Sequence, residues 1–253
     1  MDKWIGKWAF PIDDSLLEQS ARRGEQYDFA KIAEDIKNKV QFKKEDVVLD
    51  VCCGNAALTK FIANTCKEIH GVDFSEALIN SAKKITCPPT PQSGDTEQVY
   101  EISPPSGELE GALISNLHLH LSDVIETDKL FSENKFDTSY CYFSFQYFNQ
   151  QKREMLLEKL SRVTKRNGSI FIGDIPDKTR MWDFYESKGK FWREKISRAI
   201  QFKEGECDLG WWIDQKEIAD WCRKNKLEVS ILSQDKNLPH SHYRFDVLIK
   251  NTK

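Results

Sequence analysis

Short apolar runs alternate with helical stretches from Val47 onward, the pattern of parallel strands joined by crossover helices. The apolar runs predict five strands, at 47–51, 68–73, 118–123, 136–143 and 168–174. Helices are expected between them, at 56–66, 75–84 and 150–165. This alternation predicts an α/β domain of the Rossmann-like, doubly wound class.

The last part of the chain carries a different pattern. A capped helix is expected at 214–225, followed by strands at 227–233 and 243–250 that lie about ten residues apart. Such a short link leaves no room for a crossover helix, so the two strands should pair antiparallel. We therefore expect a seven-stranded, mostly parallel sheet that ends in an antiparallel C-terminal hairpin.

Length favours one domain with additions. The 253 residues suffice for one large α/β core and only marginally for two. We expect a single domain over 1–253 with its ligand-binding core at 47–174. The expected additions are an N-terminal helical cap at 1–46, a proline-rich insertion at 86–116, a lid with an aromatic cap at 176–213, and a closing helix and hairpin at 214–253.

Composition and charge narrow the classes of partner. The chain has 37 basic and 40 acidic residues, which gives no positive excess for binding nucleic acid. No apolar run approaches the ~20 residues that cross a bilayer, and the N-terminus does not read as a signal peptide. Seven cysteines without a C-x-x-C pair read as reduced thiols, with no metal site. We expect a cytoplasmic protein that binds no membrane.

A loop after the first strand carries the strongest chemical signal. Asp50 ends that strand, and the sequence Val-Cys-Cys-Gly-Asn-Ala leads from it into a helix. Asp73 follows 23 residues after Asp50 and ends the second strand. This is the arrangement of a nucleoside site at the carboxyl edge of a parallel sheet, where the loop backbone approaches the ligand and the second acid binds ribose hydroxyls.

The loop resembles the first motif of class I methyltransferases, D/E-x-G-x-G-x-G, and the interval to Asp73 is similar to that of the family. Ser122-Asp123-Val124 resembles the family's adenine-binding motif, and FDTSYCYFSF resembles its fourth strand. The closing hairpin is also a family feature. Cys52 and Ala56 stand where the family usually has glycine, so we expect donor binding to survive with slightly altered loop geometry.

The resemblance implies S-adenosylmethionine (SAM) as the cofactor, whose positive charge suits a site lined by carboxylates. A dinucleotide dehydrogenase is the nearest competing reading, but a pyrophosphate would not favour an acid beside the loop, and the full G-x-G-x-x-G is missing. The expected cofactor-binding residues are Asp50, Cys52, Gly54, Asn55, Ala56, Asp73, Phe74, Ser122, Asp123, Val124 and Tyr142.

The acceptor side is predicted from the aromatic residues. The seven tryptophans all lie outside residues 9–181, in the segments that could fold over the carboxyl edge of the sheet. Such a cap could exclude water and offer flat surfaces, or the tryptophans could simply bury the added segments against the core. The expected substrate-binding residues are Tyr147, Trp211, Trp212, Tyr243 and Arg244.

Three residues are candidates for catalysis. His240 and His242 precede the last strand, whose antiparallel direction places its start at the cofactor edge. Asp174 ends the fifth strand and could act as a base, orient a histidine, or only terminate the strand. Many family members carry a histidine after the fourth strand, but this chain has Gln146, which is no base. His118 and His120 alternate with leucines and are expected to be structural.

These features together predict an O-methyltransferase acting on a polar small molecule, such as a sugar or a phosphorylated glycan precursor. The stretches YFSFQYFN, GDIPDK and PHSHYRFDVLI are similar to bacterial small-molecule methyltransferases of surface-glycan pathways. A non-catalytic SAM-binding subunit that serves a partner protein is an alternative, motivated by the two replaced glycines. A nucleotide-dependent oxidoreductase is a third.

Overall fold

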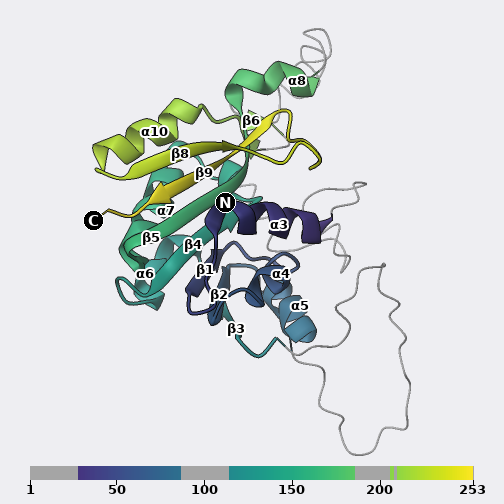
Figure 1. Cartoon of the computed structure of the whole chain (residues 1–253), viewed down its shortest axis with the longest axis vertical. Helices are drawn as coiled ribbons and strands as arrows, with labels where there is room; N and C mark the ends of the chain where they lie inside the picture. The colour runs from purple at the N-terminus through teal and green to yellow at the C-terminus, as the bar shows by residue number, and fades with distance from the viewer. Residues whose placement is uncertain (1–27, 87–113, 186–205, 208–209, 253) are drawn as a thin grey trace, which may run out of the picture.

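A computed structural model of the chain describes residues 28–86, 114–185, 206–207 and 210–252. Its centre is a seven-stranded sheet with the order β3-β2-β1-β4-β5-β9-β8 (Figure 1). The first five strands pair parallel, and β9 pairs antiparallel with both β5 and β8. The predicted fold class and C-terminal hairpin are confirmed. The strands are β1 Val47–Val51, β2 Glu68–Asp73, β3 Leu117–Leu121, β4 Phe136–Tyr142, β5 Thr164–Pro176, β8 Glu228–Ser233 and β9 Arg244–Lys250.

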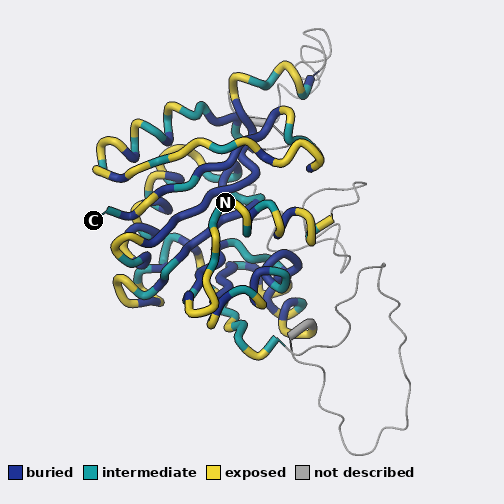
Figure 2. Tube along the Cα trace, viewed as in Figure 1, coloured by how far each residue is buried: buried dark blue, intermediate teal, exposed yellow. Residues whose placement is uncertain are grey.

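Helices cover both faces of the sheet. Side chains of α3 and α4 pack in one buried cluster with β1 and β4, and those of α7 and α10 pack in another with β5 and β9. Figure 2 shows the central strands β1, β4 and β5 among the most deeply buried parts of the chain, whereas the edge strands β3 and β8 are partly exposed. The helices are α3 Phe29–Val40, α4 Thr59–Ala63, α5 Glu76–Thr86, α6 Thr127–Leu130, α7 Gln150–Val163, α8 Met181–Tyr185 and α10 Gln215–Lys224, with 3-10 turns η1 Val124–Glu126, η2 Phe145–Tyr147 and η3 Lys178–Arg180.

Side-chain caps set where the outer helices begin. Asn149 accepts a hydrogen bond from the backbone N–H of Lys152 at 2.9 Å at the start of α7. Asp214 does the same for Lys216 at 2.9 Å at the start of α10. The predicted helix at 214–225 therefore begins at its capping residue.

The first crossover helix is shorter than predicted. The prediction gave 56–66, whereas α4 spans only Thr59–Ala63. Ala56 has a left-handed backbone with φ 61°, which no α-helix can include. The predicted third strand is shorter too, because β3 ends at Leu121 and the chain turns at once into the segment that contains Asp123.

Three histidines form a stack on the β2–β3 edge of the sheet. The ring of His70 lies 5.0 Å from that of His118 and 5.2 Å from that of His120, centroid to centroid. His70 Nδ1 is 2.9 Å from His120 Nε2, and His70 Nε2 is 2.6 Å from Glu68 Oε1. The predicted structural role of His118 and His120 agrees with this packing.

Several predicted additions lie partly outside the described residues. These are the N-terminal cap before residue 28, most of the proline-rich insertion, and the middle of the lid. The lid is described at α8 and at a short hairpin of β6 Glu206–Cys207 and β7 Gly210–Trp211. Its bounds, and the division of the chain into core and additions, stay predictions. Over the part of the chain that the structure describes, no helix is long and apolar enough to cross a bilayer.

Candidate functional site

The loop after β1 alternates left-handed residues. Cys52, Gly54 and Ala56 have φ values of 61°, 56° and 61°. These are the three positions where the methyltransferase motif has glycine, so the chain keeps a left-handed backbone at all three although two side chains are present. The prediction of a slightly altered loop is therefore not needed to explain these substitutions. The two non-glycine residues carry backbone strain instead.

We expect Cys52→Gly and Ala56→Gly to fold at least as well as the native chain, because glycine adopts a positive φ without penalty. Cys52→Val should lower the free energy of unfolding by about 1–3 kcal/mol, since a β-branched residue fits this region worst. Thermal unfolding of the three variants checks this. A valine variant as stable as the glycine variant would contradict it.

Asp50 is held by two hydroxyl groups beneath the loop. Its Oδ2 accepts hydrogen bonds from Thr59 Oγ1 and from Tyr140 Oη, each at 2.6 Å. Burial raises the pKa of Asp50 to about 7, and these two hydrogen bonds oppose the rise. A cation bound nearby would favour the ionised form, so the carboxylate suits a positively charged ligand.

Asp73 ties the ends of β1 and β2 together. One carboxylate oxygen accepts from the Gly54 N–H at 2.9 Å, and the other accepts from the Ser75 N–H at 2.9 Å. Burial raises the pKa of Asp73, against these backbone hydrogen bonds. Asp50 and Asp73 are 4% and 5% exposed, so the loop lies over two carboxylates shielded from water.

The segment after β3 lies beside Asp73. The Ser122 N–H donates to the Asp73 carbonyl at 2.9 Å, and Asp123 caps η1 by accepting from the Ile125 N–H at 3.1 Å. Asp123 is exposed and Val124 is buried. Phe74, directly after Asp73, is half-buried. The structure thus brings the predicted ribose and adenine residues to one edge of the sheet.

Tyr142 lies in a different buried cluster from Val124. Its side chain is 4% exposed and packs with Phe171 in the cluster on the α3 face, whereas Val124 belongs to the cluster on the opposite face. Its hydroxyl oxygen accepts from Gln234 Nε2 at 3.2 Å. Tyr140, which binds Asp50, belongs to the same cluster, and the predicted contact of the Tyr142 ring with the cofactor stays a prediction.

Asp174, near the end of β5, and Arg244, at the start of β9, form a buried ion pair. Arg244 Nη1 donates to Asp174 Oδ2 at 2.6 Å and to the Asp174 carbonyl at 2.5 Å. The side chain of Arg244 is 1% exposed and that of Asp174 is 3% exposed. Asp174 and Arg244 therefore neutralise each other in the structure, and their predicted roles as a base and as a substrate-binding residue stay predictions.

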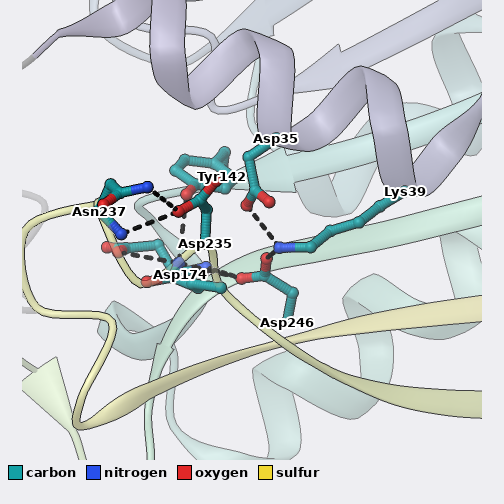
Figure 3. A network of polar contacts seen from close by, with 8 residues as sticks. Asp35, Lys39, Tyr142, Asp174, Asp235, Asn237 and Asp246 are labelled. Carbon is teal, nitrogen blue, oxygen red and sulfur yellow. Dashed lines mark hydrogen bonds and ion pairs between the residues drawn. The ribbon is translucent and has the colours of Figure 1, made fainter.

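A network of polar side chains surrounds Asp174 (Figure 3). Asp246 Oδ1 accepts from the Asp174 N–H at 2.8 Å, and Lys39 from α3 donates to Asp246 Oδ2 at 2.7 Å. Lys39 also pairs with Asp35 on its own helix. Asp174 has φ 65° where the register of β5 against β9 shifts, so the network holds a bulge at the end of β5.

His240 and His242 lie at the predicted edge of the sheet. They precede β9, whose first residue Arg244 pairs with Pro176 at the end of β5. The ring centroids of His240 and His242 lie 5.3 Å and 4.8 Å from that of Tyr243. His240 is half-buried and His242 is exposed. Their placement at the carboxyl edge agrees with the prediction, and their catalytic role stays a prediction.

An aromatic cluster lies beside these histidines. Trp212 and Tyr243 are 8% and 2% exposed, and the Phe184 ring lies 5.7 Å and 5.1 Å from theirs. Trp211 packs instead against the main core, which is the role of burying an added segment. Tyr147 is half-buried in η2 after β4. Of the predicted acceptor residues, Trp212 and Tyr243 are the two in this cluster.

Some residues of the site carry no sequence signal. Thr59 and Tyr140 bind Asp50 from a helix and from the neighbouring strand, and no spacing rule predicts that contact. Asp246 lies in a strand pattern, where an acid reads as solvent-facing. Gln146 was noted only as unable to act as a base, and the structure shows it 1% exposed in η2, after β4.

The residues fit SAM as a ligand. The arrangement offers an exposed carboxylate at Asp123, two buried ones at Asp50 and Asp73, and a loop after β1 with a left-handed backbone at three positions. When bound, SAM supplies an activated methyl group on a sulfonium. The chain's own residues bind and orient it.

Comparisons with known proteins agree with this geometry. Residues 49–172 match the family model described as "Methyltransferase domain". No curated protein matches the chain. A SAM-dependent methyltransferase from Leishmania major is similar in structure, with a TM-score of 0.65 and 10% identity, over 98% of this chain and 81% of that one.

Two further structures share the fold. A chain from the complex between the Haloferax volcanii Trm112 methyltransferase activator and the methyltransferase has a TM-score of 0.63 and 12% identity, over 100% of this chain and 97% of that one. Magnesium protoporphyrin IX methyltransferase from Synechocystis, with bound S-adenosylhomocysteine (SAH), has a TM-score of 0.55 and 12% identity, over 98% and 92%. The family match spans β1 through most of β5, which carry the donor loops. The chain is a class I SAM-dependent methyltransferase.

Proposed function

We propose that this methyltransferase transfers the methyl group to a hydroxyl oxygen of a polar small molecule, such as a sugar or a phosphorylated glycan precursor. The observation that carries the proposal is the turn at His240–Tyr243, which lies at the carboxyl edge of the sheet beside the aromatic cluster. Flat aromatic surfaces next to a polar, titratable turn suit an acceptor with both apolar ring faces and hydroxyl groups.

The main contribution of the protein to methyl transfer is to align the acceptor with the methyl group of the donor. The acceptor attacks the methyl carbon in line with the departing sulfur, and holding the two in place supplies roughly 7–11 kcal/mol of the barrier. A hydroxyl acceptor also loses its proton. Of the three candidate bases Asp174, His240 and His242, Asp174 is paired with Arg244, which leaves the two histidines as the candidates for this step. His240 is the better candidate because it is partly shielded from water.

The test is methyl transfer from radiolabelled SAM across a panel of sugars, sugar phosphates, amines and carboxylic acids. We expect product only with hydroxyl acceptors, and with the best of them we expect His240→Gln to lower kcat about 100-fold. The affinity for SAH should stay the same in the variant. Products with amines alone, or full activity of both His240→Gln and His242→Gln, would contradict the proposal.

A second candidate is a non-catalytic SAM-binding subunit that serves a partner protein. The pairing of Asp174 with Arg244 favours it, because a paired carboxylate is less available to assist the reaction. One similar structure is a complex with a methyltransferase activator, which supports looking for a partner. SAH binding without transfer to any acceptor, together with a partner recovered on the tagged chain, would favour this candidate over the first.

A further inference from the structure

Three buried polar atoms near the aromatic cluster have no hydrogen-bond partner among the residues that the structure describes. They are Trp212 Nε1, Arg244 Nε and Gln234 Oε1. The residues that carry them are 8%, 1% and 6% exposed, in that order. Buried polar groups are nearly always hydrogen-bonded, so unpaired atoms gathered in one region point to a ligand that supplies the missing partners.

Arg244 connects the three residues in space. Its guanidinium carbon lies 5.3 Å from the centre of the Tyr243 ring, and the centre of the Trp212 ring lies 5.9 Å from that same point. Arg244 Nη1 and Gln234 Nε2 donate to the two oxygens of the Asp174 carboxylate, at 2.6 Å and 3.4 Å. The unpaired atoms are therefore carried by residues that share two neighbours, Tyr243 and Asp174.

Backbone hydrogen bonds at the end of β5 hold Trp212 and Tyr243 in place. The Asp177 N–H donates to the Tyr243 carbonyl at 2.9 Å. The Ile213 N–H donates to the Pro176 carbonyl at 2.9 Å, and Ile213 forms a parallel bridge with Asp177. The segments that carry the two rings thus both pair with the end of β5, at the carboxyl edge of the sheet where the acceptor is expected.

The chemistry of the three atoms is fixed. An indole N–H and a guanidinium N–H can only donate, so Trp212 and Arg244 each need an acceptor. Turning the Gln234 amide over would set its oxygen against the carboxylates of Asp174 and Asp246, so its unpaired atom is the oxygen, which needs a donor. A hydroxyl group both accepts and donates. The three atoms together therefore suit a compound with several hydroxyl groups.

Charge argues against an anionic ligand at these residues. The guanidinium of Arg244 is already paired with Asp174, and Arg180 is paired with Asp177 at 3.6 Å. Asp246, fully buried, accepts from the Asp174 N–H and adds a further acid. A phosphate bound at Arg244 would bring more negative charge close to these carboxylates in a buried setting, which is costly. As a dianion it also has no hydrogen to donate to the unpaired amide oxygen.

We propose that Trp212, Arg244 and Gln234 bind an uncharged sugar as the methyl acceptor. Trp212 Nε1 and Arg244 Nε donate to oxygens of the sugar, and one of its hydroxyl groups donates to Gln234 Oε1. The inference rests on the proposed function and narrows it, because these three residues select the neutral sugar over its phosphorylated form.

The test compares methyl hexosides with the matching hexoside 6-phosphates as acceptors. The native chain is expected to use the best neutral hexoside with a kcat/KM at least about tenfold above that of its 6-phosphate. Trp212→Phe keeps an aromatic ring and loses the N–H, and Arg244→Lys keeps a cation for Asp174 and loses Nε. Each variant is expected to raise the KM for the neutral hexoside about tenfold and to leave the dissociation constant of SAH unchanged.

Matched controls make the same changes elsewhere in the molecule. Trp221 packs against the main core, and Arg153 is 4% exposed and pairs with Glu217 at 2.5 Å. Trp221→Phe and Arg153→Lys should both keep the KM of the native chain for the neutral hexoside. Unchanged binding of SAH shows that each variant is folded at its donor site.

A higher kcat/KM for the 6-phosphate, or a native KM in either folded variant, would overturn the inference and leave the proposed function standing. If Arg244→Lys does not fold, Trp212→Phe decides alone. If no hexoside is methylated, calorimetry with hexosides in the presence of SAH decides. Hexoside binding that weakens about tenfold in Trp212→Phe would support the sugar site although the proposed function fails, and a native chain that binds no hexoside would refute the inference.

Discussion

Arg244→Met should lower the free energy of unfolding by about 3–5 kcal/mol, because it removes the cation from a buried ion pair and leaves the carboxylate of Asp174 uncompensated. Methionine fills a similar volume, so the loss comes from charge rather than from a cavity. Gln234 Nε2 donates to Asp174 Oδ1 at 3.4 Å, but this neutral amide does not replace the lost positive charge. Urea denaturation followed by circular dichroism measures the change.

The matched control is Arg162→Met. Its guanidinium is 48% exposed and pairs with Glu158 at 2.9 Å, so we expect a loss of only about 0–1 kcal/mol. The double variant Arg244→Met with Asp174→Asn should recover part of the stability, because the uncompensated charge is then gone. Equal losses at Arg244 and Arg162, or a double variant that is less stable still, would show that the buried pair is not what holds this edge.

Acid should destabilise the protein through His70. Burial, with a further contribution from the positive charge of Lys135, lowers the pKa of His70 to about 4, whereas an unfolded chain titrates near 6.5. The folded state therefore keeps His70 neutral, and its contribution is complete above pH 6.5. As the pH falls from about 6.5 to 4, His70 is protonated in the unfolded state but stays neutral in the folded state. The free energy of unfolding therefore decreases by roughly 3 kcal/mol.

Comparison with His70→Gln isolates this effect. Glutamine is neutral at every pH and can still bond to Glu68 and His120. Asp50 acts in the opposite direction, since its raised pKa makes the folded state bind a proton first, but it is present in both proteins. The free energy of unfolding of the native chain, relative to that of His70→Gln, should thus decrease as the pH falls from 6.5 to 4. His118→Gln, at a side chain 48% exposed, should leave the slope of the native chain in place.

The fold follows from patterns that the sequence displays openly. Each strand of the sheet is an apolar run, and each long helix has one apolar face, so their order and the closing hairpin were predictable. The donor loop was also predictable, because Asp50, Gly54 and Asp73 fall at fixed intervals from strand ends. The shortened α4 was not, since its cause is the left-handed backbone at Ala56, a residue that ordinarily favours a helix.

What the sequence did not predict at the site has a common physical cause. Strand position correctly places Asp174, Arg244 and Tyr142 at or near the edge formed by the carboxyl ends of the parallel strands. It does not predict which residue each side chain contacts. Arg244 reads as a surface cation near a turn, and only the packing of β9 against β5 reveals that it is buried against Asp174. Contacts between residues 70 or more positions apart are tertiary facts, and a single sequence carries no local sign of them.

The position of β9 also bears on how the molecule comes together on the ribosome. It is made after β8, yet it lies between β5 and β8, so β8 has nothing to pair with until its successor emerges. Lys39, made 207 residues earlier, likewise waits for Asp246. During synthesis the nascent chain therefore carries an open edge at β5 for a long time, and that edge is where a chaperone, or a second unfinished copy, would attach first.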